Sequence, residues 1–414
     1  MHISAFRALR PADGLAEKIV SVPYDVVSRE EAKEMADGNP YSFLRVVRSD
    51  LEFPESADPY GQEIYSRAKE NFEKLIREGS LIRETGPALY IYQLEQNGHL
   101  QTGLVARNHV DDYINGKIKK HELTREDKEN DRTRHIDVLG ANSGPVFLTF
   151  RSNRAPELSR LLKEAVSKSE KLYDITRDGG VTHRIFRVID TSLIQGISEA
   201  YEKMECLYIA DGHHRAASTA RACMIRREKK GNFSGEEAFN WFLSVSFPDE
   251  ELRILPYNRA VKDLNGLSPD EFLARISEKF EIQEEKKVPA RREMGLYMNR
   301  KWYTLRFKKM AGQAGEITEN LDVSILQNNV LDPILGIDDP RRSERIVFVG
   351  GIRGDKELVK LVDSGEFAAA FSMHPTSLEE LEDIADAGKI MPPKSTWFEP
   401  KLCSGFLINL LDAD

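Results

Sequence analysis

The sequence predicts a mixed α/β protein of two domains. Segments rich in β-branched and aromatic residues alternate with amphipathic helical segments along the whole chain. An Asn97-Gly98 pair separates two β-rich segments, which is typical of a β-hairpin. The 414 residues exceed one ordinary domain. We therefore expect a domain of residues 1–262 and a smaller α/β domain of residues 263–414, with a soft boundary where the composition shifts towards charge.

Composition excludes several classes of protein. Hydrophobic residues make up 40% of the chain and charged residues 31%, as in soluble globular proteins. The net charge of −9 argues against general binding to DNA or RNA backbone, which needs a positive field. No apolar segment approaches the roughly 18 residues of a membrane span, and the N-terminus does not read as a signal peptide. The three cysteines fit neither a disulfide framework nor a zinc knuckle, so we expect a reducing cytosol.

The N-terminal half of the chain is expected to hold several strands and three helices. Strands are expected at residues 3–8, 18–22, 42–47, 88–95, 100–107 and 145–150. Ser28 with Glu31 predicts a capping box at the start of a helix. The segment 62–77 has the apolar spacing of an amphipathic helix. The charged segment 115–137 is expected to be a loop and then a helix from near Thr124.

The remaining elements follow the same alternation. A hairpin is expected around Asp178-Gly179-Gly180, with His183 on a sheet surface rather than in the chemistry. Further elements are expected at residues 193–204 (helix), 206–210 (strand), 214–229 (helix) and 241–247 (strand). Ser268 with Glu271 predicts a second capping box, at the start of a helix.

The most informative segment is the junction of a strand, a tight Asp211-Gly212 turn and a helix. Gly212 lets the backbone turn sharply and lets a ligand approach. The free N–H groups of the first helical turn favour an anion, and His213, His214 and Arg215 add side-chain donors there. We favour a phosphate site over an ordinary junction with polar caps. A zinc site is disfavoured because neighbouring histidines on a helix diverge.

At this segment the chain resembles known proteins. Ile209-Ala210-Asp211-Gly212-His213-His214-Arg215 is similar to the phosphate-binding motif of the ParB/sulfiredoxin superfamily, whose free-serine kinases carry a very similar Asp-Gly-His-His-Arg. The whole chain resembles the prokaryotic family called domain of unknown function 1015. The segments that carry this resemblance are Val22–Ser28, Asn39-Pro40, Lys119–Thr124, Lys128, Asp131-Arg132, Leu255–Arg259 and Met391–Lys401. The resemblance implies a ParB/sulfiredoxin-like nucleotide-binding core within residues 1–262.

Two further segments could serve a phosphate site. The first holds cations and carboxylates suited to phosphoryl transfer: Lys119, Lys120, His121, Glu122, Asp131 and Arg132. The alternative for this segment is a solvated helix with ion pairs. The second is the proline-rich segment 391–401, whose stiffness would present Lys394, Ser395, Thr396 and Lys401 as a lid or rim. Its alternative is a tail that packs its aromatic residues on the core.

Weaker candidates lie elsewhere in the chain. Asp25 could be a second carboxylate near the site, although a turn-capping role explains it nearly as well. Asn258 and Arg259 end a strand as polar contacts, and half or more of such arginines form structural ion pairs.

These observations predict a nucleotide-dependent phosphotransferase acting on a small hydroxylated metabolite, with free L-serine as the substrate that the resemblance implies. ATP or ADP with Mg²⁺ would be the donor. Asp211 and Glu122 are the candidate catalytic carboxylates, and Asp211 and Asp131 the candidate metal ligands. One alternative is a nucleotide-binding regulatory protein of ParB type, and another is a metal-dependent hydrolase. We expect no membrane or nucleic-acid partner, and the oligomeric state, including a homodimer, stays open.

Overall fold

Two units make up the chain in the computed structural model, which describes residues 1–177, 179–308 and 316–412. The first unit comprises residues 1–120, 124–252 and 400–414, and the second comprises 121–123 and 253–399. These limits differ from the expected boundary near residue 262, because the second unit begins at Arg253 and the C-terminal residues belong to the first. The mixed α/β class is confirmed.

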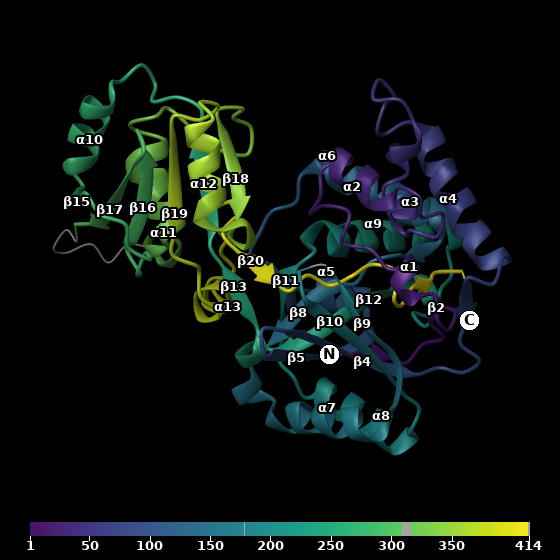
Figure 1. The fold of residues 1–414 in the computed structure, drawn as a ribbon. Coiled ribbons are helices and arrows are strands. Elements are labelled where there is room, and N and C mark those ends of the chain that lie inside the picture. Colours follow the sequence, from purple (N-terminus) through teal and green to yellow (C-terminus); the bar gives the residue numbers. More distant parts are fainter. Residues whose placement is uncertain (178, 309–315, 413–414) are drawn as a thin grey trace. The chain divides into compact units, whose positions relative to one another are not determined.

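A mixed sheet forms the centre of the first unit (Figure 1). Nine strands within the described residues follow the order β6-β11-β8-β12-β5-β4-β10-β9, with β1 paired to β5. Their bounds are β1 (Ile3–Ser4), β4 (Leu89–Gln96), β5 (His99–His109), β6 (Ile118–Lys119), β8 (Val146–Phe150), β9 (Glu170–Arg177), β10 (Val181–Val188), β11 (Leu207–Asp211) and β12 (Trp241–Pro248). The hairpin expected at Asn97-Gly98 is confirmed as β4–β5, with Gln96 opposite His99. Strand β11 is parallel to β6 and antiparallel to β8.

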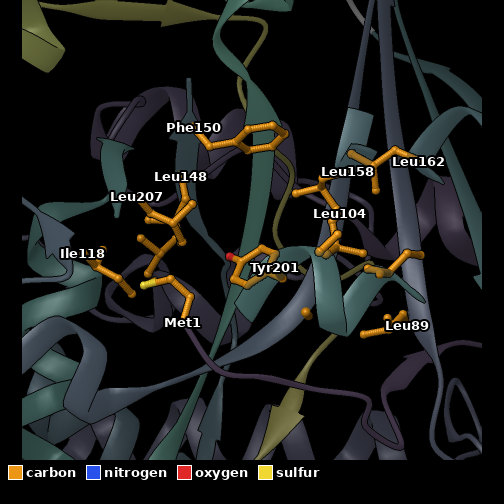
Figure 2. Packing of buried hydrophobic residues seen from close by; sticks show 14 of the residues in the cluster. Met1, Leu89, Leu104, Ile118, Leu148, Phe150, Leu158, Leu162, Tyr201 and Leu207 are labelled. Atoms are coloured by element: carbon orange, nitrogen blue, oxygen red, sulfur yellow. The ribbon is translucent and has the colours of Figure 1, made fainter. Parts of the chain in front are cut away.

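Helices cover this sheet and form a second layer beside it. They are α1 (Ala16–Ile19), α2 (Arg29–Ala36), α3 (Leu44–Val47), α4 (Gln62–Arg77), α5 (Val110–Ile114), α6 (Glu126–Leu139), α7 (Pro156–Lys168), α8 (Thr191–Glu202) and α9 (His213–Lys230). Helices α7 and α8 lie side by side along the sheet, and α6 packs against α9 (Figure 1). Leu158 and Leu162 of α7 meet Leu104, Phe150 and Tyr201 in the main core (Figure 2). The expected capping box at Ser28 is present at the start of α2.

Two expected strands of the N-terminal region are helical in part. Of residues 18–22, Lys18 and Ile19 end α1 while Ser21 makes a β-bridge to Ser404, and of residues 42–47 the last four form α3. Phe43, Leu44 and Val46 are all buried against the same cluster. The apolar run therefore reflects burial on every side rather than strand alternation, which periodicity in so short a segment cannot distinguish.

The C-terminal segment, residues 400–412, returns to the first unit. Strand β21 (Asn409–Leu410) pairs with β7 (Ala141–Asn142), and Ile408 bridges Leu9 of β2 (Leu9–Pro11), which pairs with β3 (Leu81–Arg83). Ser404 exchanges two backbone hydrogen bonds with Ser21. These contacts tie the last residues to segments some 250 to 400 positions earlier in the sequence.

The second unit has its own antiparallel sheet, in the order β15-β17-β16-β19-β14-β18. The strands are β14 (Tyr257–Val261), β15 (Phe280–Gln283), β16 (Glu293–Met298), β17 (Lys301–Phe307), β18 (Ile346–Gly350) and β19 (Ala369–Met373), with β13 (Arg253–Leu255) paired to β20 (Trp397–Glu399) apart from them. The helices are α10 (Pro269–Ser277), α11 (Asp322–Leu326), α12 (Gly354–Asp363) and α13 (Leu378–Asp386). The capping box expected at Ser268 is present at α10. Across both units, no helix in the described part of the chain is long and apolar enough to cross a membrane.

His183 is buried, which corrects the expectation that it lies on a sheet surface. Only 3% of the residue is exposed, because the C-terminal segment covers this part of β10. Its Nδ1 lies 2.8 Å from the Tyr92 hydroxyl and its Nε2 3.8 Å from Cys403 Sγ. The turn before β10 contains Asp178, which lies outside the described residues.

We predict that His183 makes the protein less stable in acid. Burial, with Arg177 nearby, lowers the pKa of His183 to about 3. As the pH falls below about 6.5, His183 becomes protonated in the unfolded chain but stays neutral in the folded chain. The free energy of unfolding is therefore highest above pH 6.5 and decreases as the pH falls towards 3. Lowering the pH from 7.5 to 5 should therefore reduce the free energy of unfolding by roughly 2 kcal/mol through His183 alone. Urea unfolding of wild type and His183→Gln at the two pH values measures it, and equal pH dependence in both proteins would contradict the prediction.

Candidate functional site

The turn from β11 to α9 has the geometry that the sequence predicted. Strand β11 ends at Asp211, Gly212 has φ +92°, and α9 begins at His213 and continues for 18 residues. No side chain caps the start of α9. The N–H groups of the first helical turn and the positive end of the helix dipole therefore remain available to an anion.

Arg215 lies folded back against this turn and is 8% exposed. Its Nη2 lies 3.0 Å from Asp211 Oδ2 and 4.0 Å from Asp25 Oδ2, and its Nη1 donates to the Pro145 carbonyl. Burial works against the charge, but the Asp25 and Asp211 carboxylates outweigh it and raise the pKa of Arg215. Its Nε is buried without a hydrogen-bond partner. The guanidinium is thus fully charged and keeps one unused donor.

Gly212 is what allows Arg215 to take this position. A Cβ at residue 212 would lie 3.1 Å from both Cζ and Nε of Arg215. Any side chain there would crowd the guanidinium and would also strain a backbone of positive φ. Gly212 is therefore needed both for the backbone turn and for the position of the Arg215 side chain.

The surroundings of Asp211 are completed by Asp25, a weaker candidate, and by Lys401 of the proline-rich segment. Lys401 Nζ lies 3.8 Å from Asp211 Oδ1, because the C-terminal segment returns to the first unit. Asp25, the weaker candidate, is exposed and faces Arg215. About 190 residues separate Lys401 from Asp211, so no local signal in the sequence could have joined them.

A small cavity of about 30 Å³ adjoins Arg215. Two arginines, two ring-bearing residues and several small polar residues line it: Arg132, Arg215, Tyr24, His135, Asn142, Ser143, Thr219 and Ser404. The apolar side chains of Pro23, Val47 and Ile136 complete the lining. The Arg132 guanidinium lies 4.3 Å from the centre of the Tyr24 ring. The structure therefore brings Arg132 and Arg215, both predicted to bind phosphate, to one cavity. The segment 142–144 carried no signal that sequence analysis used.

His135 and Arg132 differ in protonation. Burial, helped by the nearby Arg132 charge, lowers the pKa of His135 to about 4, so this histidine is neutral at pH 7. Burial also opposes the charge of Arg132, but Asp131 outweighs it and raises the pKa of Arg132. The positive charge at the cavity thus comes from the two arginines.

Asp131, predicted as a metal ligand, lies among other side chains of the first unit. It is buried, accepts a hydrogen bond of 2.8 Å from Tyr65 and pairs with Arg132 at 2.8 Å. Each oxygen of this carboxylate thus has one protein partner, as each oxygen of Asp211 does.

The other predicted residues of the first unit lie around the turn in different ways. His213 is buried, while His214 is half-buried and its Nε2 accepts a hydrogen bond from the Arg125 backbone at 3.1 Å. Lys119 lies on β6 beside β11, with its ammonium 6.0 Å from the Tyr208 ring centre. Lys120 is exposed. His214 thus uses one ring nitrogen, Nε2, within the protein.

The remaining predicted residues belong to the second unit. Glu122 and Lys394 lie near Tyr257: burial raises the pKa of Tyr257, the Lys394 ammonium opposes the rise and the Glu122 carboxylate adds to it. The Lys394 carbonyl accepts a hydrogen bond from Arg259.

The backbone and the small side chains of the segment 391–396 hold it in place. The His121 carbonyl accepts a hydrogen bond from the Met391 backbone. Ser395 is buried and donates to the Pro392 carbonyl, and Thr396 is half-buried. The Ser395 hydroxyl is therefore used within the segment rather than offered at a rim.

The chain belongs to a family that is known by sequence. The model of the family described as "Protein of unknown function (DUF1015)" matches residues 3–324. This confirms the resemblance seen in the sequence, although the proline-rich segment 391–401 lies outside the matched region. No curated protein matches the chain.

Solved structures show distant likenesses. A mutant of free serine kinase in complex with AMP is 16% identical, with 71% of this chain and 87% of the kinase covered and a TM-score of 0.36. A conserved hypothetical protein from Pyrococcus furiosus is 16% identical, with 74% and 95% covered and a TM-score of 0.36. SbnI with a C-terminal truncation, from Staphylococcus aureus, is 12% identical, with 74% and 87% covered and a TM-score of 0.40.

We predict that Gly212→Ala destabilises the first unit more than Gly79→Ala does. Both glycines have positive φ, so alanine should cost roughly 1–2 kcal/mol at either position. Only at Gly212 would the new Cβ meet a buried guanidinium, whereas Gly79 faces open space. Urea unfolding of the two variants measures the difference. Equal losses of stability would mean that Arg215 moves aside freely.

Proposed function

We propose that this protein is a nucleotide-dependent phosphotransferase that acts on a small hydroxylated metabolite, with free L-serine as the specific acceptor. The observation that carries the proposal is Arg215, buried against the Gly212 turn at the uncapped start of α9 with one N–H unused. Such a charged, preorganised donor beside free helix N–H groups is suited to phosphate oxygens.

The charges around the turn fit the demands of phosphoryl transfer. The transferred group spreads negative charge over its oxygens, so the site must supply positive charge and donors. Arg132 and Arg215 line one cavity, and Lys401 adds an ammonium beside Asp211. Lys119, Lys120, His213 and His214 are proposed as further contacts of the nucleotide phosphates.

Asp211 is proposed as the catalytic base. The acceptor hydroxyl oxygen forms a bond to the terminal phosphorus as the bond from that phosphorus to its bridging oxygen breaks. The hydroxyl proton passes to the Asp211 carboxylate, and the nucleotide leaves with one phosphate fewer. Arg215 and Lys401, on the two oxygens of Asp211, hold the carboxylate in place.

A divalent cation would fit beside this carboxylate. Asp25 is exposed and its carboxylate approaches the same guanidinium as Asp211, so the two supply the oxygen donors that Mg²⁺ prefers. When bound with ATP or ADP, Mg²⁺ would neutralise phosphate charge. Glu122 of the second unit is proposed as the alternative base, and Lys394 and Thr396 as additional ligand contacts.

The test is nucleotide consumption by the full chain with Mg²⁺. ATP or ADP is the donor, and L-serine and a panel of small hydroxy acids are the acceptors. We expect acceptor-dependent turnover, and Arg215→Lys should lower kcat/KM by about 100-fold or more because the positioned fork is lost. Arg221→Lys, on an exposed position of the same helix, is the matched control and should stay within about twofold of wild type.

Two further variants identify the base. Asp211→Asn should abolish turnover, whereas Glu122→Gln should do so only if the second unit supplies the base. Nucleotide binding without acceptor-dependent consumption would replace the proposed reaction with a regulatory, ParB-like function. Turnover that survives Arg215→Lys unchanged would remove the turn from the site.

A further inference from the structure

A buried arginine of the second unit, Arg259, has no counterion among the described residues. Arg259, on β14, is 3% exposed. Its guanidinium donates to two backbone carbonyls, those of Tyr257 and Lys394. Among the described residues, no carboxylate lies within ion-pair distance of it. Burial accordingly lowers the pKa of Arg259 to about 10, the opposite of what the carboxylates do for Arg215.

A buried charge without a partner is costly, and proteins usually pair it. Carbonyl dipoles hold the guanidinium in position but leave its charge uncompensated. The folded protein therefore keeps an unpaired positive charge at this position. An anionic ligand that pairs with such a buried charge gains more electrostatic energy than it would at an exposed one.

Arg259 lines a cavity of about 430 Å³, which is the size of a small-metabolite pocket. The lining combines polar side chains with apolar ones, among them Thr318, Ser324, Gln327, Asn328 and Phe348. It also carries three carboxylates, Glu319, Asp338 and Asp339, of which Asp339 is paired with Arg341 at 2.9 Å. The guanidinium carbon lies 5.3 Å from the centre of the Phe348 ring, which lines the same cavity. All of these residues belong to the second unit.

One side of this cavity is built on an irregular helix. Residues 327–331 form a single π-helical turn, η6 (Gln327–Leu331), directly after α11. Such turns are rare and occur frequently at functional sites. The Gln327 amide donates to the Ile337 carbonyl at 2.7 Å, so the π-turn is held to the chain that follows it. Asn328, by contrast, is exposed and lines the cavity.

We propose that this cavity, which is lined entirely by the second unit, binds a small metabolite through an anionic group that pairs with Arg259. The planar fork of an arginine matches a carboxylate or a phosphate. Phe348 supplies an apolar surface, and the hydroxyls and amides of the lining supply hydrogen bonds for the rest of the ligand. This site is additional to the phosphate site of the first unit and does not depend on the proposed reaction.

The test is calorimetric titration of the full chain with two probes, inorganic phosphate and malonate. We expect at least one of them to bind. Binding of phosphate alone assigns the site to phosphorylated metabolites, and binding of malonate alone assigns it to carboxylates. Arg259→Lys should weaken the binding by about tenfold or more, because the fork is lost.

Asn328→Asp keeps the test valid if Arg259→Lys does not fold. It changes an exposed residue of the cavity, and its new charge should repel the anion and weaken binding several-fold. Asn299→Asp, in the exposed β16–β17 turn, is the matched control and should bind as wild type does. Binding that Asn328→Asp leaves intact, or failure of both probes to bind, would each overturn the proposal.

Discussion

The buried charge of Arg215 constrains the centre of the first unit. A guanidinium removed from water must be matched by acceptors, and here they come from several segments: Asp211 at the end of β11, Asp25 in the loop before α2, and the Pro145 carbonyl before β8. Removing one partner would leave an uncompensated charge, at a cost of about 3–5 kcal/mol. These segments must therefore fold together for the candidate anion site to form.

Much of the site could be read from the sequence because its signals are local. The strand, the Asp211-Gly212 turn and the helix follow one another within a few residues, and each has its own residue preference. Lys401 could not be placed beside Asp211 in this way, since only the return of the C-terminal segment brings it there. The role of Asp25 could not be predicted, because a residue that caps a turn and a residue that pairs with a charge have the same local sequence pattern.

The errors of prediction have a common physical origin. The strands expected at residues 18–22 and 42–47 are helical in part, because short apolar runs report burial rather than geometry. His183 was predicted to lie at a surface because the alternation of side chains along a strand shows only which face of the sheet a residue occupies. It does not show that a segment 220 residues later covers that face.

Arg215 and Arg259 are both buried, but their positive charges are surrounded by different groups. Carboxylates neutralise Arg215, so an anion that enters there must compete with them or share the donor that they leave unused. Arg259 has only carbonyls, so its charge is available in full. Arg215 therefore suits an anion that binds together with a cation, and Arg259 suits a small anion that binds without one.

The return of residues 400–412 to the first unit also has a consequence during synthesis. A ribosome adds roughly 5–20 residues per second, so the second unit of about 150 residues takes on the order of 10–30 s to make. Throughout that time the first unit lacks the strand that pairs with β7 and the backbone that bridges Leu9 and Ser21. The nascent first unit therefore stays incomplete until residues 400–412 have been made, after the second unit. Lys401, the ammonium beside Asp211, comes with that segment, so the surroundings of Asp211 are completed only after the second unit has been synthesised.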